Sequence, residues 1–379
     1  MTHAPHGRVD APHRVLLQQT MWQPYRVPLA RWLRERSDLD VTVAHGEPQT
    51  GSALVPGDVS HLLPVVRLRN AYIGRPARVV WQNGLVREIR SGRYDVAIAA
   101  MDPRIITNLI GREAARRARV AWVWWGHGIR PRGRFRRLYA WLARDADSCI
   151  LYSEEGRQQL IAAGAPGDRL YVAPNGLDTD AAARLRRDTP FASRTAVLYV
   201  GRLLASKRVD RLIDAFRLAL PRLRPDSVLV IIGDGPDRAR LGELAADLSG
   251  RVQFVPGTYD DTRLAEHYNR AWAAVSPAAA GLSVMQAFQY GVPYVLPHGV
   301  PHGPEAAVVA HGVNGLWCEL AAPEPLAQAL VQLDGDRDHA ARLGAAGVRT
   351  VDGRFSARAM AEGFVRAVEA AVHRQRGEQ

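Results

Sequence analysis

Lys207 stands out because of its residue type and its position. Lysine and arginine together number 50 in this chain of 379 residues, and Lys207 is the only lysine. Arginine presents a wide planar fork, whereas lysine presents a compact ammonium on a slender stem, so a retained lysine suits a narrow phosphate pocket. Lys207 closes residues 199–207 (YVGRLLASK), which lie between an apolar run and the helix-like run 209–216. The end of a strand before a helix is where open α/β sheets bind ligands.

Residues 276–293 form the second segment that could do chemistry. A strand end there gives way to small residues and then to a helix expected to begin near residue 283. The backbone amides left without helical partners would be those of Gly281, Leu282 and Ser283. Together with Arg202 and Lys207 they predict one cavity with two cations and free amides, which suits a diphosphate.

Other motifs carry less chemical information. Residues 233–236 (GDGP) end a strand, but they lack the third glycine of a dinucleotide-binding loop and the GK[ST] of a P-loop. The pairs Asp145/Asp147 and Asp178/Asp180 imitate a metal-binding DxD, although helix caps and solvated carboxylates explain them better. Cys149 and Cys318 are isolated in apolar surroundings, so we expect buried reduced thiols and no metal site.

Short apolar runs alternate with helix-length segments along the whole chain. The first five runs are residues 14–18, 40–44, 95–100, 120–125 and 148–152, and five more are residues 195–200, 227–232, 251–255, 273–276 and 293–296. This alternation is typical of parallel sheets that are covered on both faces by helices. We therefore expect two Rossmann-like domains with a boundary near residue 190, followed by an amphipathic helix over 357–373.

The net charge of +12 permits binding to nucleic acid, an anionic membrane or an acidic substrate, and it does not choose among them. The densest basic group precedes the amphipathic run 138–142 and consists of Arg130, Arg132, Arg134, Arg136 and Arg137. This group could contact an acidic protein or a layer of lipid headgroups, or it could be a solvated helix face. Neither a secretory signal nor a membrane span is found in the sequence, so we expect a cytoplasmic protein, with peripheral contact at the inner membrane face as the alternative.

The order and spacing of several motifs resemble the donor half of retaining glycosyltransferases of family four. The matching segments are Gly201-Arg202 with Lys207, 233–236 (GDGP), 252–257 (VQFVPG), Ser276-Pro277, Gly281-Leu282 and 291–293 (GVP). Further matches are 25–28 (YRVP), 124–128 (WWGHG), 174–178 (PNGLD), 304–305 (PE) and 314–316 (NGL). The resemblance covers nearly the whole chain.

The resemblance implies an α/β fold of the GT-B type, in which two Rossmann-like domains face each other across a cleft. Residues 1–190, completed by a C-terminal helix over 355–379, would form the acceptor domain, and residues 191–354 would bind a nucleotide-sugar. The implied activity is retaining transfer of a hexose, with N-acetylhexosamine as a candidate, from a UDP-sugar without a metal or another cofactor. The acceptor is left open between a specialised-metabolite intermediate, free or bound to a carrier protein, and a cell-surface glycan.

The resemblance also implies the roles of individual residues. The catalytic residues would be Arg202, Lys207 and His127. The donor-binding residues would be Gly201, Val255, Pro256, Gly257, Gly281, Leu282, Ser283, Gln286 and Glu305. The acceptor-binding residues would be Trp22, Gln23, Tyr25 and Arg26, although Trp22 and Tyr25 could instead close the edge of a core.

The chain departs from the family pattern at a pair of glutamates that usually follows the segment beginning at Ser276. Ala280 stands near the first position and Gln286 replaces the second. We interpret this as a branch of the family that lacks the pair. Gln286 can still hydrogen-bond a ribose hydroxyl, and Glu305 can supply a carboxylate beside the donor.

Three other interpretations remain. A catalytically silent nucleotide-sugar-binding protein would explain the missing glutamates, and a sugar-nucleotide epimerase could share the same fold, with His127 and Glu305 as its only acid–base candidates. Binding to nucleic acid has only the net charge in its favour and is not expected, because no recognised binding module is present.

Overall fold

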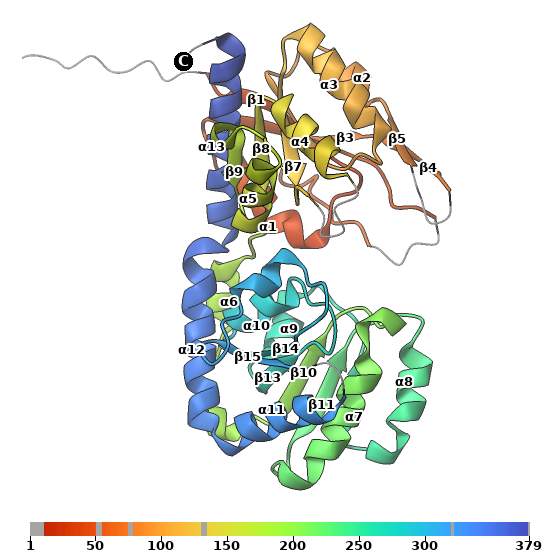
Figure 1. The fold of residues 1–379 in the computed structure, drawn as a ribbon, viewed down its shortest axis with the longest axis vertical. Helices are drawn as coiled ribbons and strands as arrows, with labels where there is room; N and C mark the ends of the chain where they lie inside the picture. Colours follow the sequence, from red (N-terminus) through yellow and green to blue (C-terminus); the bar gives the residue numbers. More distant parts are fainter. Residues whose placement is uncertain (1–10, 51–54, 75–78, 130–134, 320–321, 378–379) are drawn as a thin grey trace, which may run out of the picture. The chain divides into compact units, whose positions relative to one another are not determined.

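The computed structural model describes residues 11–50, 55–74, 79–129, 135–319 and 322–377 (Figure 1). The chain divides into two compact units. Unit 1 comprises Met1–Gly176 and Ala357–Gln379, and unit 2 comprises Leu177–Ser356. Each unit has its own parallel sheet and its own core.

Unit 1 is built on a sheet with the strand order β3-β2-β1-β6-β7-β8-β9 (Figure 1). Its strands are β1 (His13–Gln19), β2 (Leu39–His45), β3 (Val65–Arg67), β6 (Val96–Ala100), β7 (Ala121–Gly126), β8 (Ser148–Leu151) and β9 (Leu170–Val172). All neighbouring pairs are parallel. The central strands are buried on both faces, which explains why they form continuous apolar runs in the sequence.

Helices cover both faces of this sheet. They are α1 (Val27–Arg34), α2 (Leu85–Ile89), α3 (Ile106–Ala118), α4 (Arg136–Arg144), α5 (Glu154–Ala162) and α13 (Ala357–Arg376). Val15 and Leu17 of β1 pack in the core that includes α1 and α13, whereas Leu16 packs in the core that includes α3, α4 and α5. An antiparallel hairpin of β4 (Arg69–Ile73) and β5 (Val79–Asn83) precedes α2.

Unit 2 is built on a sheet with the strand order β12-β11-β10-β13-β14-β15. Its strands are β10 (Ala196–Val200), β11 (Val228–Ile232), β12 (Val252–Val255), β13 (Ala271–Val275), β14 (Tyr294–Pro297) and β15 (Gly315–Cys318). Its helices are α6 (Thr179–Leu185), α7 (Val209–Ala219), α8 (Arg238–Leu244), α9 (Asp261–Tyr268), α10 (Ser283–Gln289), α11 (Glu324–Gly335) and α12 (Arg337–Arg354). One core contains side chains of α7, α8 and α11, and the other contains side chains of α6, α9 and α10.

Short 3-10 turns connect several of these elements. They are η1 (Pro24–Arg26), η2 (Gly167–Arg169), η3 (Phe191–Ser193), η4 (Ala205–Lys207), η5 (Leu220–Arg222), η6 (Ala246–Leu248) and η7 (Pro304–Val308). Two of them, η4 and η7, carry residues that matter for the site described below.

The division between the units differs from the predicted boundary near residue 190, because it falls at Gly176. The intervening segment packs on unit 2. Asn269 accepts a hydrogen bond from the Arg187 amide at 3.0 Å and donates one to the Leu185 carbonyl at 2.9 Å. Leu177 and Ala182 are buried in the unit 2 core, so apolar contacts assign this arginine-rich connector to the second unit.

Candidate functional site

The strand order of unit 2 reverses between β10 and β13, which are adjacent in the sheet although the strands β11 and β12 lie between them in the chain. Such a reversal point, at the carboxyl ends of parallel strands, leaves a crevice that open α/β sheets use for ligands. The segment that leaves β10 carries Arg202 and Lys207, and the segment that leaves β13 carries residues 276–283. The fold therefore places the two predicted segments at one edge of one sheet.

Lys207 connects these two segments directly. Its Nζ donates a hydrogen bond to the Ala279 carbonyl at 2.6 Å. The side chain is half-buried, and burial, followed by the charge of Arg202, lowers the pKa of Lys207 below its ordinary value. An ammonium has three donors. One is used on Ala279, so the others remain available to a ligand.

Arg202 lies close enough to influence Lys207 electrostatically. Its side chain is exposed, and within the part of the chain that the structure describes it makes no hydrogen bond or ion pair. Tyr199 fixes the backbone instead, because its hydroxyl donates to the Arg202 carbonyl at 3.1 Å. The arrangement offers two neighbouring cations with unused donors.

The GDGP motif holds the Arg202–Lys207 loop in place. The Leu203 amide donates to the Asp234 carbonyl at 2.9 Å, and a Cβ on Gly235 would lie only 2.1 Å from the Leu203 carbonyl oxygen. Gly235 has a φ of +157° and Gly233 a φ of +155°, which L side chains rarely adopt. The glycines are therefore needed because two backbone segments approach closely, and the motif is a structural support for the site.

The helix α10 begins at Ser283, as the sequence predicted. Leu282 is its N-cap residue and supplies no side-chain cap. Among the described residues, the backbone amides of Gly281, Leu282 and Ser283 have no hydrogen-bond acceptor. Three amide donors thus follow Ala279, the residue that Lys207 contacts.

His302 was missed by the sequence analysis, although it packs against the same segment. Its Nδ1 accepts a hydrogen bond from the Ala280 amide at 3.2 Å, and its Nε2 donates to the Pro297 carbonyl at 2.9 Å. Burial is the main cause that lowers the pKa of His302, and the charge of Lys207 adds to it. These contacts fix the neutral form of the ring, which holds the backbone at Ala280. A histidine three residues before Glu305, just after a strand, was the available signal.

Glu305 is buried beside these amides. A Cβ added to Gly281 would lie 3.8 Å from Glu305 Oε2, and a Cβ added to Gly303 would lie 2.5 Å from the same atom. Gly303 therefore leaves the space that the carboxylate occupies. The structure brings a carboxylate to this site although the usual glutamate pair is missing from α10 and the segment before it.

The remaining predicted donor residues surround this centre. Gln286 is half-buried on α10 and makes no side-chain hydrogen bond to any described residue. Val255 is half-buried at the end of β12, while Pro256 and Gly257 are exposed. The Gly257 amide donates to Asp234 Oδ2 at 2.8 Å, which ties this turn to the GDGP motif. Their contacts with a nucleotide stay a prediction.

In unit 1, Arg26 and its neighbours form a buried polar cluster. The guanidinium donates to Gln19 Oε1, donates to the Tyr152 hydroxyl at 2.7 Å, and lies 4.2 Å from the centre of the Trp125 ring. Its Nε is buried without a partner, and no carboxylate pairs with it within the described residues. The Tyr152 ring in turn lies 4.6 Å from the ring of His127, which is exposed directly after β7.

The predicted acceptor residues have different environments. Trp22 is wholly buried in the core of unit 1, which favours the alternative that its side chain closes the edge of the core over a contact with an acceptor. Gln23 and Tyr25 are half-buried around the 3-10 turn η1. Their role, like that of His127 and Arg26, remains a prediction.

The aspartate pairs serve structural purposes. Asp147 accepts a hydrogen bond from the Trp122 amide at 2.7 Å, and Asp145 pairs with Arg112. Asp178 caps α6 by accepting a hydrogen bond from the Ala181 amide. In the ranges that the structure covers, no group of three or more His, Cys, Asp and Glu side chains is arranged to hold a metal.

Both cysteines are free thiols. Burial raises the pKa of Cys149 to about 12 and that of Cys318 to about 11, so both are unreactive at neutral pH.

Arg130, Arg132 and Arg134 of the basic group lie outside the described residues, while α4 contains Arg136 and Arg137. None of the helices described is both long and apolar enough to cross a membrane.

Comparison with known protein families gives two adjoining matches. Residues 22–176 match the model described as "Glycosyl transferase 4-like domain", and residues 183–350 match "Glycosyl transferases group 1". Together the two models account for most of both units. The chain is a group 1, family-four-type glycosyltransferase.

Curated relatives of this glycosyltransferase match it over part of their length. An exopolysaccharide phosphotransferase of Streptomyces coelicolor is 32% identical over 202 residues, which cover 50% of this chain and 20% of that protein. A GDP-mannose-dependent phosphatidylinositol monomannoside mannosyltransferase of Mycobacterium tuberculosis is 29% identical over 222 residues. These cover 53% of this chain and 56% of that protein. A lipopolysaccharide core biosynthesis glycosyltransferase of Rhizobium meliloti is 32% identical over 185 residues, which cover 48% and 52%.

Solved structures share the fold over nearly the entire glycosyltransferase. Anabaena HepE in complex with UDP matches with a TM-score of 0.68 and 19% identity, covering 94% of this chain and 100% of that one. A glycosyltransferase of Rickettsia africae matches with a TM-score of 0.73 and 13% identity, covering 95% and 99%. The expected GT-B fold with two parallel-sheet α/β domains is confirmed.

Proposed function

We propose that this glycosyltransferase moves a hexose from a nucleoside diphosphate sugar to an acceptor, with the diphosphate bound at the reversal point of the unit 2 sheet. The observation that carries this proposal is the hydrogen bond from Lys207 Nζ to the Ala279 carbonyl. It brings a half-buried ammonium beside three unpartnered amides. Cations and amides that are fixed in advance are what a leaving diphosphate requires.

The proposed mechanism uses these groups as negative charge grows on the leaving diphosphate. Arg202 and Lys207 neutralise the charge, and the amides of 281–283 hydrogen-bond the phosphate oxygens, so the transfer proceeds without a metal. Glu305 lies beside Gly281 and accepts a hydrogen bond from a hydroxyl of the donor sugar. Configuration is retained by attack on the same face, with the departing phosphate taking the proton of the acceptor.

The donor base that we propose is uracil, with guanine as the second candidate. Anabaena HepE was crystallised with UDP and with UDP-glucose, whereas several curated relatives are named for GDP-mannose. The turn at Val255–Gly257 is the proposed contact for the base. N-acetylhexosamine stays the candidate sugar.

The acceptor that we propose is a cell-surface glycan or its lipid-linked precursor. Relatives named for exopolysaccharide, lipopolysaccharide core and phosphatidylinositol mannoside support this choice over a specialised metabolite. Such an acceptor fits a cytoplasmic enzyme that meets the inner membrane face through the basic α4 region. Gln23, Tyr25, Arg26 and His127 would line the acceptor side.

The test is calorimetry with UDP, GDP, ADP and dTDP in the presence of EDTA, followed by the corresponding sugars. We expect one nucleotide to bind with micromolar affinity to the natural protein and to lose that affinity in Lys207→Ala. Arg222→Ala is the matched control, because this substitution also removes one positive charge. Arg222 is exposed in η5, which follows the C-terminal end of α7.

Two results would contradict the proposal. One is the absence of binding by all four nucleotides, and the other is an equal loss of affinity in Lys207→Ala and Arg222→Ala. Product analysis then separates transfer from epimerisation and from binding alone, because only transfer joins the sugar to a second molecule.

A further inference from the structure

A cavity of about 550 Å³ opens in unit 1 between the end of β3, the hairpin β4–β5 and the helix α2. This volume lies in the range of 300–1,000 Å³ that is typical of small-molecule sites. Three arginines line it, namely Arg67, Arg69 and Arg87, together with Asn83 and Glu88. The donor residues proposed above all belong to unit 2, so this cavity is a separate feature of the molecule.

The residues that line the cavity carry more positive than negative charge. Glu88 is its one acidic side chain, and that carboxylate is buried and already paired with Arg93, which does not line the cavity. Arg69 and Arg87 are exposed, and neither makes a hydrogen bond or an ion pair with any residue that the structure describes. Two guanidinium groups therefore face one hollow without an anion.

Asn83 adds further donors. Its Oδ1 accepts a hydrogen bond from Trp81 Nε1 at 2.8 Å, and an indole can only donate, so the amide is oriented with its oxygen towards Trp81. The two N–H groups of the Asn83 amide have no partner among the described residues. The polar groups of the cavity are thus nearly all donors.

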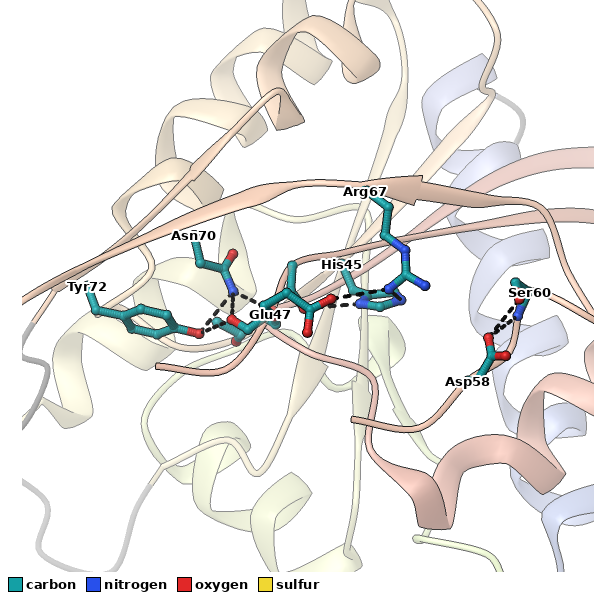
Figure 2. A network of polar contacts seen from close by, with 9 residues as sticks. His45, Glu47, Asp58, Ser60, Arg67, Asn70 and Tyr72 are labelled. Atoms are coloured by element: carbon teal, nitrogen blue, oxygen red, sulfur yellow. Dashed lines mark hydrogen bonds and ion pairs between the residues drawn. The ribbon is translucent and has the colours of Figure 1, made fainter. Parts of the chain in front are cut away.

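Arg67 is held in place at the rim, as Figure 2 shows. Its Nη1 donates to His45 Nε2 at 3.1 Å, while His45 Nδ1 donates to the Gly46 carbonyl at 3.1 Å. Both ring nitrogens of the neutral His45 therefore have a hydrogen-bond partner. Burial lowers the pKa of His45, which favours this neutral form. Glu47 Oε1 lies 3.5 Å from the same guanidinium nitrogen, which is a long contact at an exposed position. The positive charge of Arg67 is therefore only weakly compensated.

Arginines elsewhere in the chain include some that pair with a carboxylate and others that do not. Arg14 makes a two-point contact with Asp95, and Arg217 makes one with Asp247. Other exposed arginines, such as Arg90, Arg119 and Arg222, have no carboxylate partner among the described residues, so an unpaired arginine alone does not indicate a site. The cavity differs because two unpaired arginines converge on a concave surface that is rich in donors.

We propose that this cavity binds an oxyanion, a phosphate or a carboxylate carried by a ligand of saccharide size, between Arg69 and Arg87. The planar fork of arginine matches both kinds of group and forms charge-assisted hydrogen bonds with them. Asn83 donates to the sugar hydroxyls of the same ligand. The proposal does not depend on the activity assigned to unit 2, so either can fail without the other.

The test is calorimetry on the full chain with four probes, namely glucose 6-phosphate, glucuronate, inorganic phosphate and glucose. The variants are Arg69→Ala and Arg87→Ala, and Arg90→Ala is the matched control, since Arg90 is an exposed residue at the end of the same helix that does not line the cavity. All three side chains are exposed, so the fold should tolerate their removal. Lys207→Ala is included because the proposed diphosphate site could also bind a phosphate.

We expect an anionic sugar to bind more tightly than glucose, and we expect Arg69→Ala and Arg87→Ala each to weaken it by about ten- to a hundredfold. Arg90→Ala and Lys207→Ala should keep the affinity within about twofold. A preference for glucose 6-phosphate identifies a phosphate site, and a preference for glucuronate identifies a carboxylate site. The proposal is refuted if no anionic probe binds better than glucose, if Arg90→Ala weakens binding as much as Arg87→Ala, or if only Lys207→Ala abolishes it.

Discussion

Replacing Lys207 by arginine keeps the positive charge and therefore tests whether the site needs a lysine. Lys207 Nζ lies 2.6 Å from the Ala279 carbonyl in a half-buried space between the segments that leave β10 and β13. A guanidinium is larger, planar and directed by a rigid fork. It cannot occupy this point and still direct the other donors at a diphosphate, so we expect Lys207→Arg to fail as Lys207→Ala does.

The expected magnitude follows from the loss of one donor that is fixed before the reaction. Such a loss costs about 3–4 kcal/mol in the transition state, or about 100- to 1,000-fold in kcat. The assay is the initial rate of nucleoside diphosphate release from the donor identified by calorimetry. Arg222→Ala serves as the charge-matched control and should stay within about twofold of the natural protein. A rate for Lys207→Arg near that of the natural protein would refute the reasoning.

The pH dependence of binding gives an independent test of the same residue. The pKa of Lys207 is below its ordinary value of 10.5, because burial and the charge of Arg202 disfavour the ammonium. The charged form exists below this pKa, so diphosphate affinity should be constant near neutral pH and fall as the pH rises through the lowered pKa. Lys207→Ala should lack this alkaline decline, and an identical decline in the variant would contradict the assignment.

Three predictions concern stability and are measured by urea unfolding. Gly235→Ala places a Cβ 2.1 Å from the Leu203 carbonyl at a φ of +157°, so the free energy of unfolding should fall by about 3 kcal/mol or more. Arg337→Met leaves the buried carboxylate of Asp334 without its ion pair and should cost about 3–5 kcal/mol. Arg26→Met leaves no carboxylate unpaired, so it should cost less than about 2 kcal/mol while the transfer rate falls. An unchanged midpoint in the first two, or a loss for Arg26→Met as large as that for Arg337→Met, would contradict these arguments.

The buried parts of the fold could be predicted because burial leaves a signal in the sequence. All ten apolar runs correspond to strands, since a strand that is covered on both faces needs consecutive apolar residues. The segments after β10 and β13 were identified by residue type, namely a single lysine and a run of small residues before a helix. Whether these two segments lie next to each other depends on the order of the strands in the sheet. That order came from the resemblance to a family and not from the residues themselves.

Other features had no such signal. The strands β3, β4 and β5 are short or partly exposed, so their residues do not form an apolar run. Trp22 was assigned to the acceptor because it follows the first strand, but a neighbouring position in the chain does not determine whether a side chain points outwards or into the core. The position of His302 three residues before Glu305 was its one signal in the sequence, and that position does not reveal its backbone contacts with Ala280 and Pro297.

Arg26 and Arg337, two of the three arginines that are buried among the described residues, show how burial alone fails to identify a functional charge. Arg337 and Arg26 are both almost inaccessible and both lie over an indole ring, at 4.4 Å from Trp272 and 4.2 Å from Trp125. Arg337 pairs with Asp334, so its charge is neutralised inside unit 2 and its role is structural. The hydrogen-bond acceptors of Arg26 are all neutral, and its charge stays uncompensated. The third buried arginine, Arg194, also donates to carbonyl oxygens, at 3.2 Å from Thr189 and 3.0 Å from Ala271. Because a buried arginine can be satisfied by neutral acceptors alone, the missing carboxylate does not by itself mark a ligand site, and the predicted acceptor role of Arg26 depends on the transfer rate of Arg26→Met.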